Sequence, residues 1–346
     1  MGRDAYLDWL VHNTQTVWWN DSADPAEVQL ALDRGAVGVT TNPFLASVAL
    51  ARNRMAWTAD VESVLAKNLD AESKAEELLR GMVTRAASMV RCHFEKSDGK
   101  QGYVCAQVNP SRAGDREAML AMARRSRAWA PNIAVKLPAV SAGLDVLEDC
   151  IAEGISAVAT ISFTVPQVIA TAERCRAGRR RAESKGIKPG ECFAVIMIGR
   201  LDDYLREVAL DNRISVSESD LRQAGLAVTK RAHGIYQERN YEAVLMVAAL
   251  RGSYHLTELA GAKLVVSIAP APQEWFVTQD HPREERINEE IAPDVLQRLS
   301  AMPEFLKAYE PHGMNPREFI SYGAAQRTLS QYVEAGWKLL EETGRL

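Results

Sequence analysis

The amino-acid sequence predicts an α/β fold: a single (β/α)₈ barrel of the TIM type with additional helices at the C-terminus. The first indication is that eight short apolar segments alternate with helical segments between about residues 16 and 267. The second is that these segments contain few polar residues, which is typical of parallel strands buried on both faces. The third is that no Pro-, Gly- or Ser-rich linker and no repeat divides residues 1–346. Barrels of roughly 200 to over 400 residues occur as one domain, so we expect a single domain here.

Each predicted element has a local reason. Pro25 can occupy the first position of a helix, where its missing N–H is tolerated, and Asp24 can cap that helix before Gly35 ends it. The predicted strands are residues 16–19, 36–40, 102–107, 133–137, 156–160, 192–196, 243–247 and 263–267. The predicted helices include residues 5–13, 25–34, 56–93, 112–128, 141–153 and 165–186. An amphipathic helical tail, about residues 284–343, lies within a C-terminal extension of about residues 271–346.

The segment Asn132-Ile-Ala-Val-Lys-Leu-Pro138 places a lysine at the carboxyl end of a buried strand. Pro138 disfavours the helical conformation of Leu137, so we expect the strand to end there. A lysine is rarely buried without a reason. Desolvation beside apolar side chains disfavours the ammonium form of Lys136, and the neutral amine could then attack a carbonyl carbon to form a Schiff base. The alternative is a lysine whose stem packs while its ammonium group reaches water.

Polar residues close most of the other predicted strands. In (β/α)₈ barrels the residues at the carboxyl ends of the strands surround the active site. A carboxylate near the lysine can transfer protons, and an amide and a hydroxyl can hold a sugar or a water molecule. Two arginines can bind a phosphate through paired hydrogen bonds. The residues at these positions are Asp21, Asn42, Gln107, Lys136, Thr160, Arg200 and Arg251.

Each of these polar residues, taken singly, also has a structural explanation. Asp21 could close a turn, and Asn42 could simply begin a helix. Gln107 and Thr160 could bond to the backbone at strand ends, and the two arginines could form surface ion pairs. Their placement around one lysine favours a common site.

The composition excludes several classes of protein. Apolar residues make up 47% of the chain, charged residues 25%, and the net charge is −4, so we expect neither nucleic acid nor a membrane as a partner. No apolar run has the length of a membrane span, and the first residues lack the long apolar core typical of a signal peptide. The five cysteines include no Cys-x-x-Cys pair, which favours a reducing, cytoplasmic compartment. No metal-binding or nucleotide-binding motif occurs, so we expect neither a metal nor a cofactor.

The sequence resembles the transaldolase family over about residues 16–275. The motifs that carry the resemblance are Gly38-Val-Thr-Thr-Asn-Pro43, Ala134-Val-Lys-Leu-Pro138, Gly154-Ile155 with Thr160, Gly199-Arg200, and Glu258-Leu-Ala-Gly261. The resemblance implies a (β/α)₈ barrel without a metal or a dissociable cofactor. It also implies a small-molecule sugar phosphate as the partner, while assembly into a homo-oligomer is left open.

The same resemblance implies a role for most of the polar residues. Lys136 would form the Schiff base, and Asp21 would be its acid/base partner. Asn42 would bind a substrate hydroxyl, and Thr160 would help hold the catalytic water. Arg200 and Arg251 would bind the substrate phosphate.

The sequence departs from the family pattern at four positions. Gln107 stands where transaldolases have a catalytic glutamate; the related fructose-6-phosphate aldolases have a glutamine there, which can position a water but cannot act as a base. Met197 stands where those aldolases have a tyrosine. Val158 and Val195 stand where the family has an asparagine and a serine that hold a sugar donor. The loss of two hydrogen bonds, at roughly 0.5–1.5 kcal/mol each, would change donor recognition.

Three functions follow from these observations. The first is a transaldolase-type enzyme of carbohydrate metabolism, which transfers a ketol fragment of a sugar phosphate through the lysine Schiff base. The second is an aldolase, which releases the fragment; Gln107 favours it and Met197 does not. The third is a non-catalytic barrel that binds a sugar phosphate. The retention of both Lys136 and Asp21 argues against this third function, because binding alone requires neither a nucleophile nor an acid/base partner.

Overall fold

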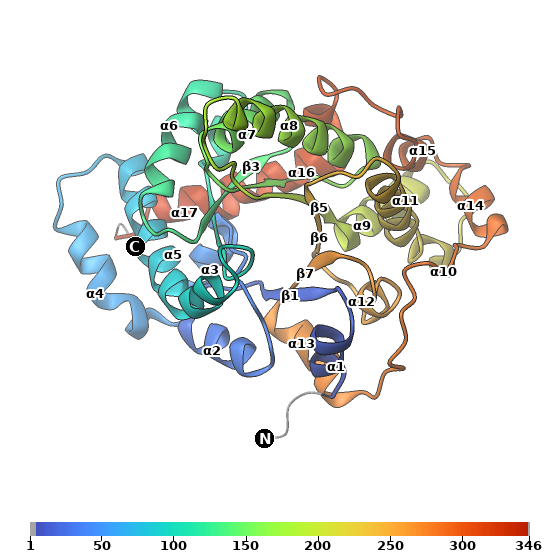
Figure 1. The fold of residues 1–346 in the computed structure, drawn as a ribbon, viewed down its shortest axis with the longest axis horizontal. Coiled ribbons are helices and arrows are strands. Elements are labelled where there is room, and N and C mark those ends of the chain that lie inside the picture. Colours follow the sequence, from blue (N-terminus) through green and yellow to red (C-terminus); the bar gives the residue numbers. More distant parts are fainter. Residues whose placement is uncertain (1–4, 345–346) are drawn as a thin grey trace.

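A computed structural model describes residues 5–344 of the chain, and Figure 1 shows its fold. At its centre is a parallel sheet with the strand order β1-β7-β6-β5-β4-β3-β2. The strands are β1 (Val17–Asn20), β2 (Val104–Gln107), β3 (Ile133–Pro138), β4 (Ala157–Thr160), β5 (Cys192–Met197), β6 (Val244–Ala248) and β7 (Leu264–Ile268). Nearly all of their residues are buried, as expected of parallel strands covered on both faces.

Residues 36–40, predicted to form the second strand, close the sheet between β1 and β2. Val39 pairs with Asn20 of β1 and with Val104 of β2, in each case as an isolated parallel bridge. On the side of β2, the N–H of Val39 donates to the carbonyl oxygen of Tyr103 at 2.9 Å. On the side of β1, the N–H of Asn20 donates to the carbonyl oxygen of Gly38 at 2.9 Å. The predicted barrel is therefore confirmed, with one of its eight members reduced to a single pairing residue.

Aromatic side chains fill the barrel below the carboxyl ends of the strands. The ring centroid of Phe193 lies 5.0 Å from that of Trp19 and 5.7 Å from that of Tyr103. Gly38 lies against the Trp19 indole, and a Cβ atom at this position would come within 2.7 Å of the ring. Because this layer is packed, the remaining open space lies above it, at the carboxyl ends.

Helices surround the barrel (Figure 1). In chain order they are α1 (Ala5–Asn13), α2 (Pro25–Asp33), α3 (Pro43–Arg52), α4 (Arg54–Leu65), α5 (Ala71–Lys96), η1 (Pro110–Arg112), α6 (Arg116–Arg127), α7 (Ser141–Ala152), α8 (Val165–Glu183), α9 (Ile198–Asp211), α10 (Glu218–Leu221), α11 (Ala224–Glu238), α12 (Tyr254–Thr257), α13 (Pro270–Thr278), α14 (Pro293–Leu299), α15 (Pro303–Tyr309), η2 (Phe319–Ser321), α16 (Gly323–Tyr332), η3 (Val333–Trp337) and α17 (Lys338–Glu341). Among residues 5–344 no helix has the length and apolar content needed to cross a membrane.

Two predicted boundaries were wrong for local reasons. The helical stretch 56–93 is divided into α4 and α5, because Asp70 accepts a hydrogen bond from the N–H of Ser73 at 2.7 Å and starts a new helix. Strand β3 continues through Pro138, which pairs with Thr160 at the end of β4. A proline at the last position of a strand needs no N–H for the ladder, so it did not end the strand one residue earlier.

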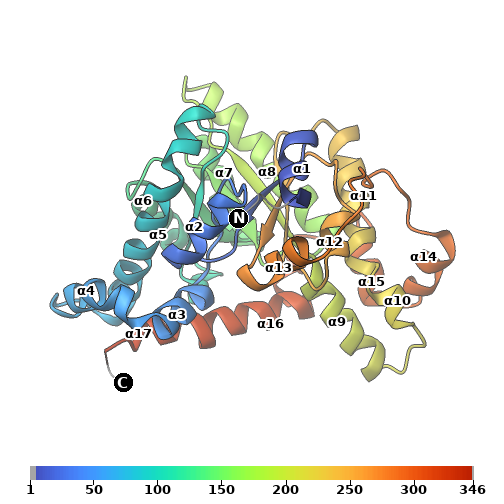
Figure 2. The same cartoon turned by 90° about the horizontal axis from the view of Figure 1, so that it is seen from below.

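The C-terminal region is helical over a smaller span than predicted. After α13, residues 279–292 contain no helix, so the prediction of a helical tail from about residue 284 was wrong for this segment. Farther on, α16, the π-helical turn η3 and α17 form a continuous rod. Figure 2 shows this rod running beneath the barrel from α9 to α3 and α4. Both α3 and α9 begin just after a strand position, so the rod crosses the carboxyl end of the barrel.

Candidate active site

A cavity of about 210 Å³ lies at the carboxyl ends of the strands. Most of the predicted site residues line it, from six separate strand ends or the turns that follow them. These residues are Asp21, Asn42, Lys136, Thr160, Arg200 and Arg251. Gln107 is the predicted residue that does not line it. The arrangement of the barrel brings together side chains that are up to 230 positions apart in the sequence.

Lys136 is a buried amine inside this cavity. It lies on β3, its side chain is only 5% exposed, and its Nζ donates to the backbone oxygen of Thr41 at 3.2 Å. Cys105 on the neighbouring strand is the nearest alternative nucleophile, but burial raises the pKa of its thiol to about 11. The thiol therefore stays protonated at neutral pH, and Lys136 is the amine that lines the cavity.

Asp21 belongs to a directed chain of hydrogen bonds. The hydroxyl of Thr40 donates to Oδ1 of Asp21 at 2.7 Å, and the hydroxyl of Ser267 contacts that of Thr40. Because Thr40 gives its only hydroxyl proton to the carboxylate, Ser267 must be the donor to Thr40. These two hydrogen bonds hold Asp21 as a hydrogen-bond acceptor facing the cavity. The sequence interpretation missed Thr40 and Ser267, although each lies at or near the end of a predicted strand.

Asn42 both begins a helix and lies in the cavity, the two possibilities considered for it from the sequence. Its side-chain oxygen accepts a hydrogen bond from the N–H of Leu45 at 3.0 Å and caps α3. The same side chain lines the cavity, where its amide nitrogen remains available as a donor. A helix cap and a binding group are therefore combined in one residue.

Gln107 and Thr160 flank the lysine strand on its two sides. Gln107 pairs in register with Lys136, and Thr160 pairs with Pro138 two residues later. The Oε1 atom of Gln107 and the hydroxyl of Thr160 are buried, and neither has a hydrogen-bond partner among residues 5–344. The next residue, Ile161, has a φ of 56°, which is unfavourable for a β-branched side chain and places local strain beside the site.

Arg200 has no carboxylate partner within the described part of the chain. It occupies the first turn of α9, and its Nε is buried without a hydrogen-bond partner within residues 5–344. Its Nη1 donates to the hydroxyl of Thr328 at 3.4 Å, and its Cζ lies 5.6 Å from the ring centroid of Tyr332. A buried guanidinium N–H without a partner is costly. The Nε of Arg200 is therefore a donor that the described chain leaves unsatisfied.

Arg251 is held much more completely. Its Nε and Nη2 each lie 2.8 Å from the same carboxylate oxygen of Asp203, and its Nη1 donates to the carbonyl oxygens of Ala249 and Leu250. Its side chain is 40% exposed. The ion-pair alternative considered for the arginines therefore applies to Arg251, although its side chain also reaches the cavity.

A buried carboxylate–histidine pair supports the turn that carries Arg251. The N–H of Arg251 donates to Nδ1 of His255 at 3.1 Å, so the proton of a neutral imidazole is on Nε2, which lies 2.9 Å from Asp202. Asp202 also accepts from the N–H of Gly225 at 2.8 Å. Burial raises the pKa of the Asp202 carboxyl, and the hydrogen bond from His255 opposes that rise.

The wall formed by β5 and β6 is apolar. Val195 and Met197 of β5 and Met246 of β6 line the cavity, whereas Val158 is buried beside Lys136 without lining it. Hydrogen-bonding groups are instead concentrated around β1, β7 and the turns. Within the described residues, no three His, Cys, Asp or Glu side chains are grouped in a way that could hold a metal ion.

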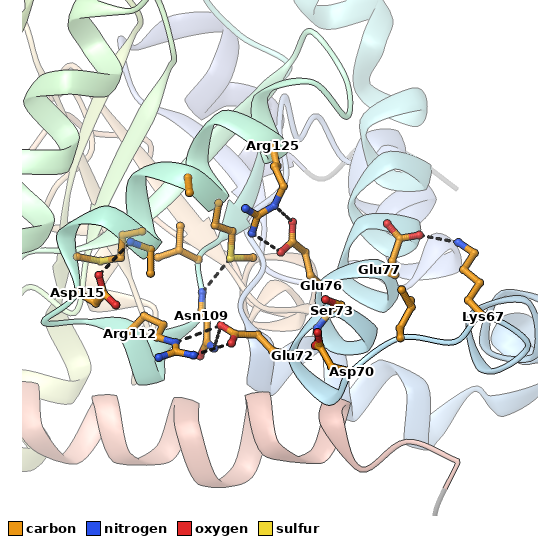
Figure 3. Close-up of a pocket in the computed structure, with 16 residues that line it drawn as sticks. Lys67, Asp70, Glu72, Ser73, Glu76, Glu77, Asn109, Arg112, Asp115 and Arg125 are labelled. Atoms are coloured by element: carbon orange, nitrogen blue, oxygen red, sulfur yellow. Dashed lines mark hydrogen bonds and ion pairs between the residues drawn. The ribbon is translucent and has the colours of Figure 1, made fainter.

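A larger cavity, of about 610 Å³, lies between α5 and α6 on the outside of the barrel (Figure 3). Its lysine and arginine side chains pair with glutamates of the same lining, and Asp70 and Asp115 cap helices. Arg125 binds Glu76 at 2.7 Å, and Arg112 binds Glu72 at 2.8 Å, as the dashed lines show. Because these charges are already neutralised, this cavity does not compete with the lysine cavity as a reaction site.

Fold and site together define a class of protein: an α/β barrel whose carboxyl-end cavity combines a buried lysine, a carboxylate and two arginines. The family model described as Transaldolase/Fructose-6-phosphate aldolase matches residues 18–315. The chain belongs to this family.

Individual relatives agree with this membership. The chain is 30% identical over 213 residues to a transaldolase of Mycolicibacterium paratuberculosis, which covers 58% of this chain and 55% of that protein. It is 29% identical over 239 residues to a transaldolase of Mycolicibacterium smegmatis, with 64% and 62% covered. It is 30% identical over 226 residues to a protein named transaldolase 2 from Nostoc sp., with 62% and 59% covered. The chain thus matches less than two thirds of the length of each of these relatives.

Proposed function

We propose that this protein is a transaldolase-type transferase that acts on a ketose phosphate through a Schiff base on Lys136. The observation that supports this most strongly is that the buried Lys136 amine lines the same small cavity as the Asp21 carboxylate and Arg200, whose Nε has no partner within residues 5–344. A site that only binds a sugar phosphate would need neither a desolvated amine nor a carboxylate held as a proton acceptor.

The chemistry follows from the positions of these groups. The neutral amine of Lys136 attacks the ketone carbon, and the resulting carbinolamine loses water to give an iminium ion. Asp21 accepts the proton of the substrate hydroxyl that becomes the aldehyde. The adjacent carbon–carbon bond breaks, its electron pair moves into the iminium, and an enamine stays bound to Lys136. The first aldehyde leaves, the enamine carbon attacks an acceptor aldehyde, and Asp21 returns its proton to the oxygen of that aldehyde. Water then hydrolyses the new iminium to release the product and the free amine of Lys136.

Gln107 and Thr160 are proposed to position the water used in these steps. Their buried oxygen atoms lack partners among residues 5–344, and buried polar atoms are normally paired, often through water. Gln107 cannot take a proton as a base, so proton transfer would depend mainly on Asp21. The apolar wall that includes Val195 and Met197 supports a donor with few hydroxyls facing β5.

The alternative function is an aldolase, in which the enamine is protonated and the fragment released. Gln107 favours it, because the side chain can hold a water close to the enamine without a carboxylate that would act as a base. The two functions share the Schiff base and differ in the fate of the fragment. The ratio of transferred to released fragment, measured with and without an acceptor aldehyde, distinguishes them.

Borohydride trapping tests the proposal directly. Incubation with ketoses and ketose phosphates followed by reduction should add one substrate mass to the peptide that contains Lys136. Lys136→Arg keeps the positive charge but cannot form an imine, so this variant should fold and lose both the adduct and the turnover.

Lys230 provides a matched control for this experiment. It is a partly buried lysine outside the cavity; desolvation lowers its pKa, and it donates to the carbonyl oxygens of Arg286 and Glu289. Lys230→Arg should keep the adduct. A label on Lys230, or turnover by the Lys136→Arg variant, would contradict the proposed mechanism.

A further inference from the structure

The helical rod at the carboxyl end of the barrel is fixed against α3, the helix that Asn42 caps. Gly336 in η3 lies so close to this helix that a Cβ atom would come within 2.6 Å of the backbone nitrogen of Phe44. The hydroxyl of Ser47 donates to the carbonyl oxygen of Ala335 at 3.0 Å. The rod is therefore part of the cavity's surroundings, as its position next to α3 in Figure 2 also shows.

Tyr332 stands where α16 passes into the π-helical turn η3. Its side chain is only 2% exposed, yet it lines the cavity, and its hydroxyl has no hydrogen-bond partner among the residues from 5 to 344. The ring is packed, but the hydroxyl oxygen keeps accessible surface where Tyr332 lines the cavity, and single π-helical turns are frequent at functional sites. The unpaired hydroxyl therefore suggests a ligand in the cavity.

The same stretch of helix supports Arg200. Thr328, one turn before Tyr332, accepts a hydrogen bond from Nη1 of Arg200, and the Tyr332 ring lies 5.6 Å from the guanidinium carbon. These contacts fix one side of the guanidinium and leave its buried Nε without a partner in the described chain. Arg200 and Tyr332 are therefore neighbours in the lining of one cavity, with the guanidinium carbon 5.6 Å from the tyrosine ring centroid.

We propose that Tyr332 is a substrate-binding residue that completes the phosphate subsite. Its hydroxyl donates to a phosphate oxygen that Arg200 also binds, while its ring holds the guanidinium in place. The proposal rests on the proposed function, since it assumes a phosphorylated substrate. Under this proposal, a residue of the C-terminal extension contacts the substrate directly, together with the residues at the strand ends.

The test is the binding of inorganic phosphate by calorimetry, which requires no turnover. Tyr332→Phe keeps the ring beside Arg200 and removes only the hydroxyl. We expect the dissociation constant for phosphate to rise by about tenfold, the effect of one hydrogen bond to a charged group. The KM for a phosphorylated ketose should rise by a similar factor, while kcat changes by less than about twofold, because the contact is equal in ground and transition states.

Tyr309 is the matched control, because it also packs beneath an arginine. The Cζ of Arg231 lies 4.4 Å from the Tyr309 ring centroid, outside the cavity. Tyr309→Phe should leave phosphate binding unchanged. Phosphate binding by Tyr332→Phe within about twofold of the unsubstituted protein would overturn the proposal, as would no phosphate binding by the unsubstituted protein. Failure of the enzymatic proposal alone would appear differently: phosphate would bind, but borohydride would trap no adduct on Lys136.

Discussion

At the scale of single residues, the two arginines of the cavity differ in the hydrogen bonds and ion pairs that they form with the rest of the protein. Four N–H groups of Arg251 are engaged by Asp203 and by two backbone carbonyl oxygens. Arg200 has one long hydrogen bond to Thr328 and a buried Nε without a partner in residues 5–344. Binding of an anion to Arg200 satisfies an unpaired donor, whereas binding to Arg251 competes with a carboxylate. Arg200 should therefore contribute more to phosphate affinity.

Replacing the arginines one at a time tests this difference. Arg200→Ala should raise the KM for a phosphorylated ketose by about 10-fold to 100-fold, the range for a charged hydrogen bond, and Arg251→Ala by less. Asp203→Asn should release Arg251 and lower this KM by about two- to fivefold, since an exposed ion pair is worth about 0–1 kcal/mol. Unphosphorylated analogues serve as the control substrates. Equal losses with both kinds of substrate would indicate that the arginines are structural.

At the scale of secondary-structure elements, the site depends on close contact between the start of α9 and the turn after β6. Gly199 makes this contact possible, because a Cβ atom there would lie 2.3 Å from the carbonyl oxygen of Ala249 and 2.5 Å from Cγ of Arg251. Ala249 itself has a φ of 63°, so the turn is already strained and has little freedom to retreat. The contact links the positions of the two arginines.

Gly199→Ala should therefore destabilise the protein and weaken phosphate binding together. We expect a loss of about 1–3 kcal/mol in the free energy of unfolding, the usual cost of forcing an extra group into a packed contact. Urea denaturation and the KM for a phosphorylated ketose measure the two effects. Gly234→Ala is the control: a Cβ atom on α11 would meet no atom within 4 Å. That substitution should stabilise by up to about 1 kcal/mol through helix propensity. A Gly199→Ala variant as stable as the original protein would contradict this account.

At the scale of the whole molecule, an ion pair ties the C-terminal extension to the barrel helices. Arg298 of α14 binds the buried Asp220 of α10 through Nε at 2.9 Å and Nη2 at 2.8 Å. The hydrogen bonds from Arg298 lower the pKa of the Asp220 carboxyl from 3.8 to about 2. This ion pair is one of several contacts that hold the extension, which includes Tyr332, against the barrel helices.

The pH dependence of stability should reveal this ion pair. A carboxyl whose pKa is lower in the folded than in the unfolded state stabilises the fold above its unfolded pKa, and this stabilisation is lost as the pH falls through the folded value. For Asp220 the loss should occur between about pH 4 and pH 2. Asp220→Asn should reduce the slope of unfolding free energy against pH in that window. Adding Arg298→Gln should reduce the slope a little further, because Arg298 also lowers the pKa of the Asp294 carboxyl through a hydrogen bond. If the slope of unfolding free energy against pH is the same with and without the Asp220 carboxyl, the ion pair does not contribute to stability.

Local patterns in the sequence were sufficient to predict most of the strands and helices of the barrel. Buried strands leave continuous apolar runs, and helix starts show caps such as Asp24, which accepts hydrogen bonds from the N–H groups of Ala26 and Glu27. Because the carboxyl ends of all the strands meet at one end of a barrel, polar residues at those positions could be assigned to one site before any contact was known. That residues 1–346 form one domain stays a prediction.

Only the tertiary structure decided how these residues are used. Residues 36–40 retain a single pairing residue, Gln107 lies outside the cavity lining, and Asp203 engages Arg251. Tyr332, which follows the end of the last strand by more than 60 residues, reaches the cavity from the end of α16. None of these features has a local sequence signal, because each depends on contacts between elements that are distant in the chain. The sequence by itself determined which side chains close the strands; packing between the strand ends, the turns and the C-terminal rod determined which of them remain free to bind a substrate.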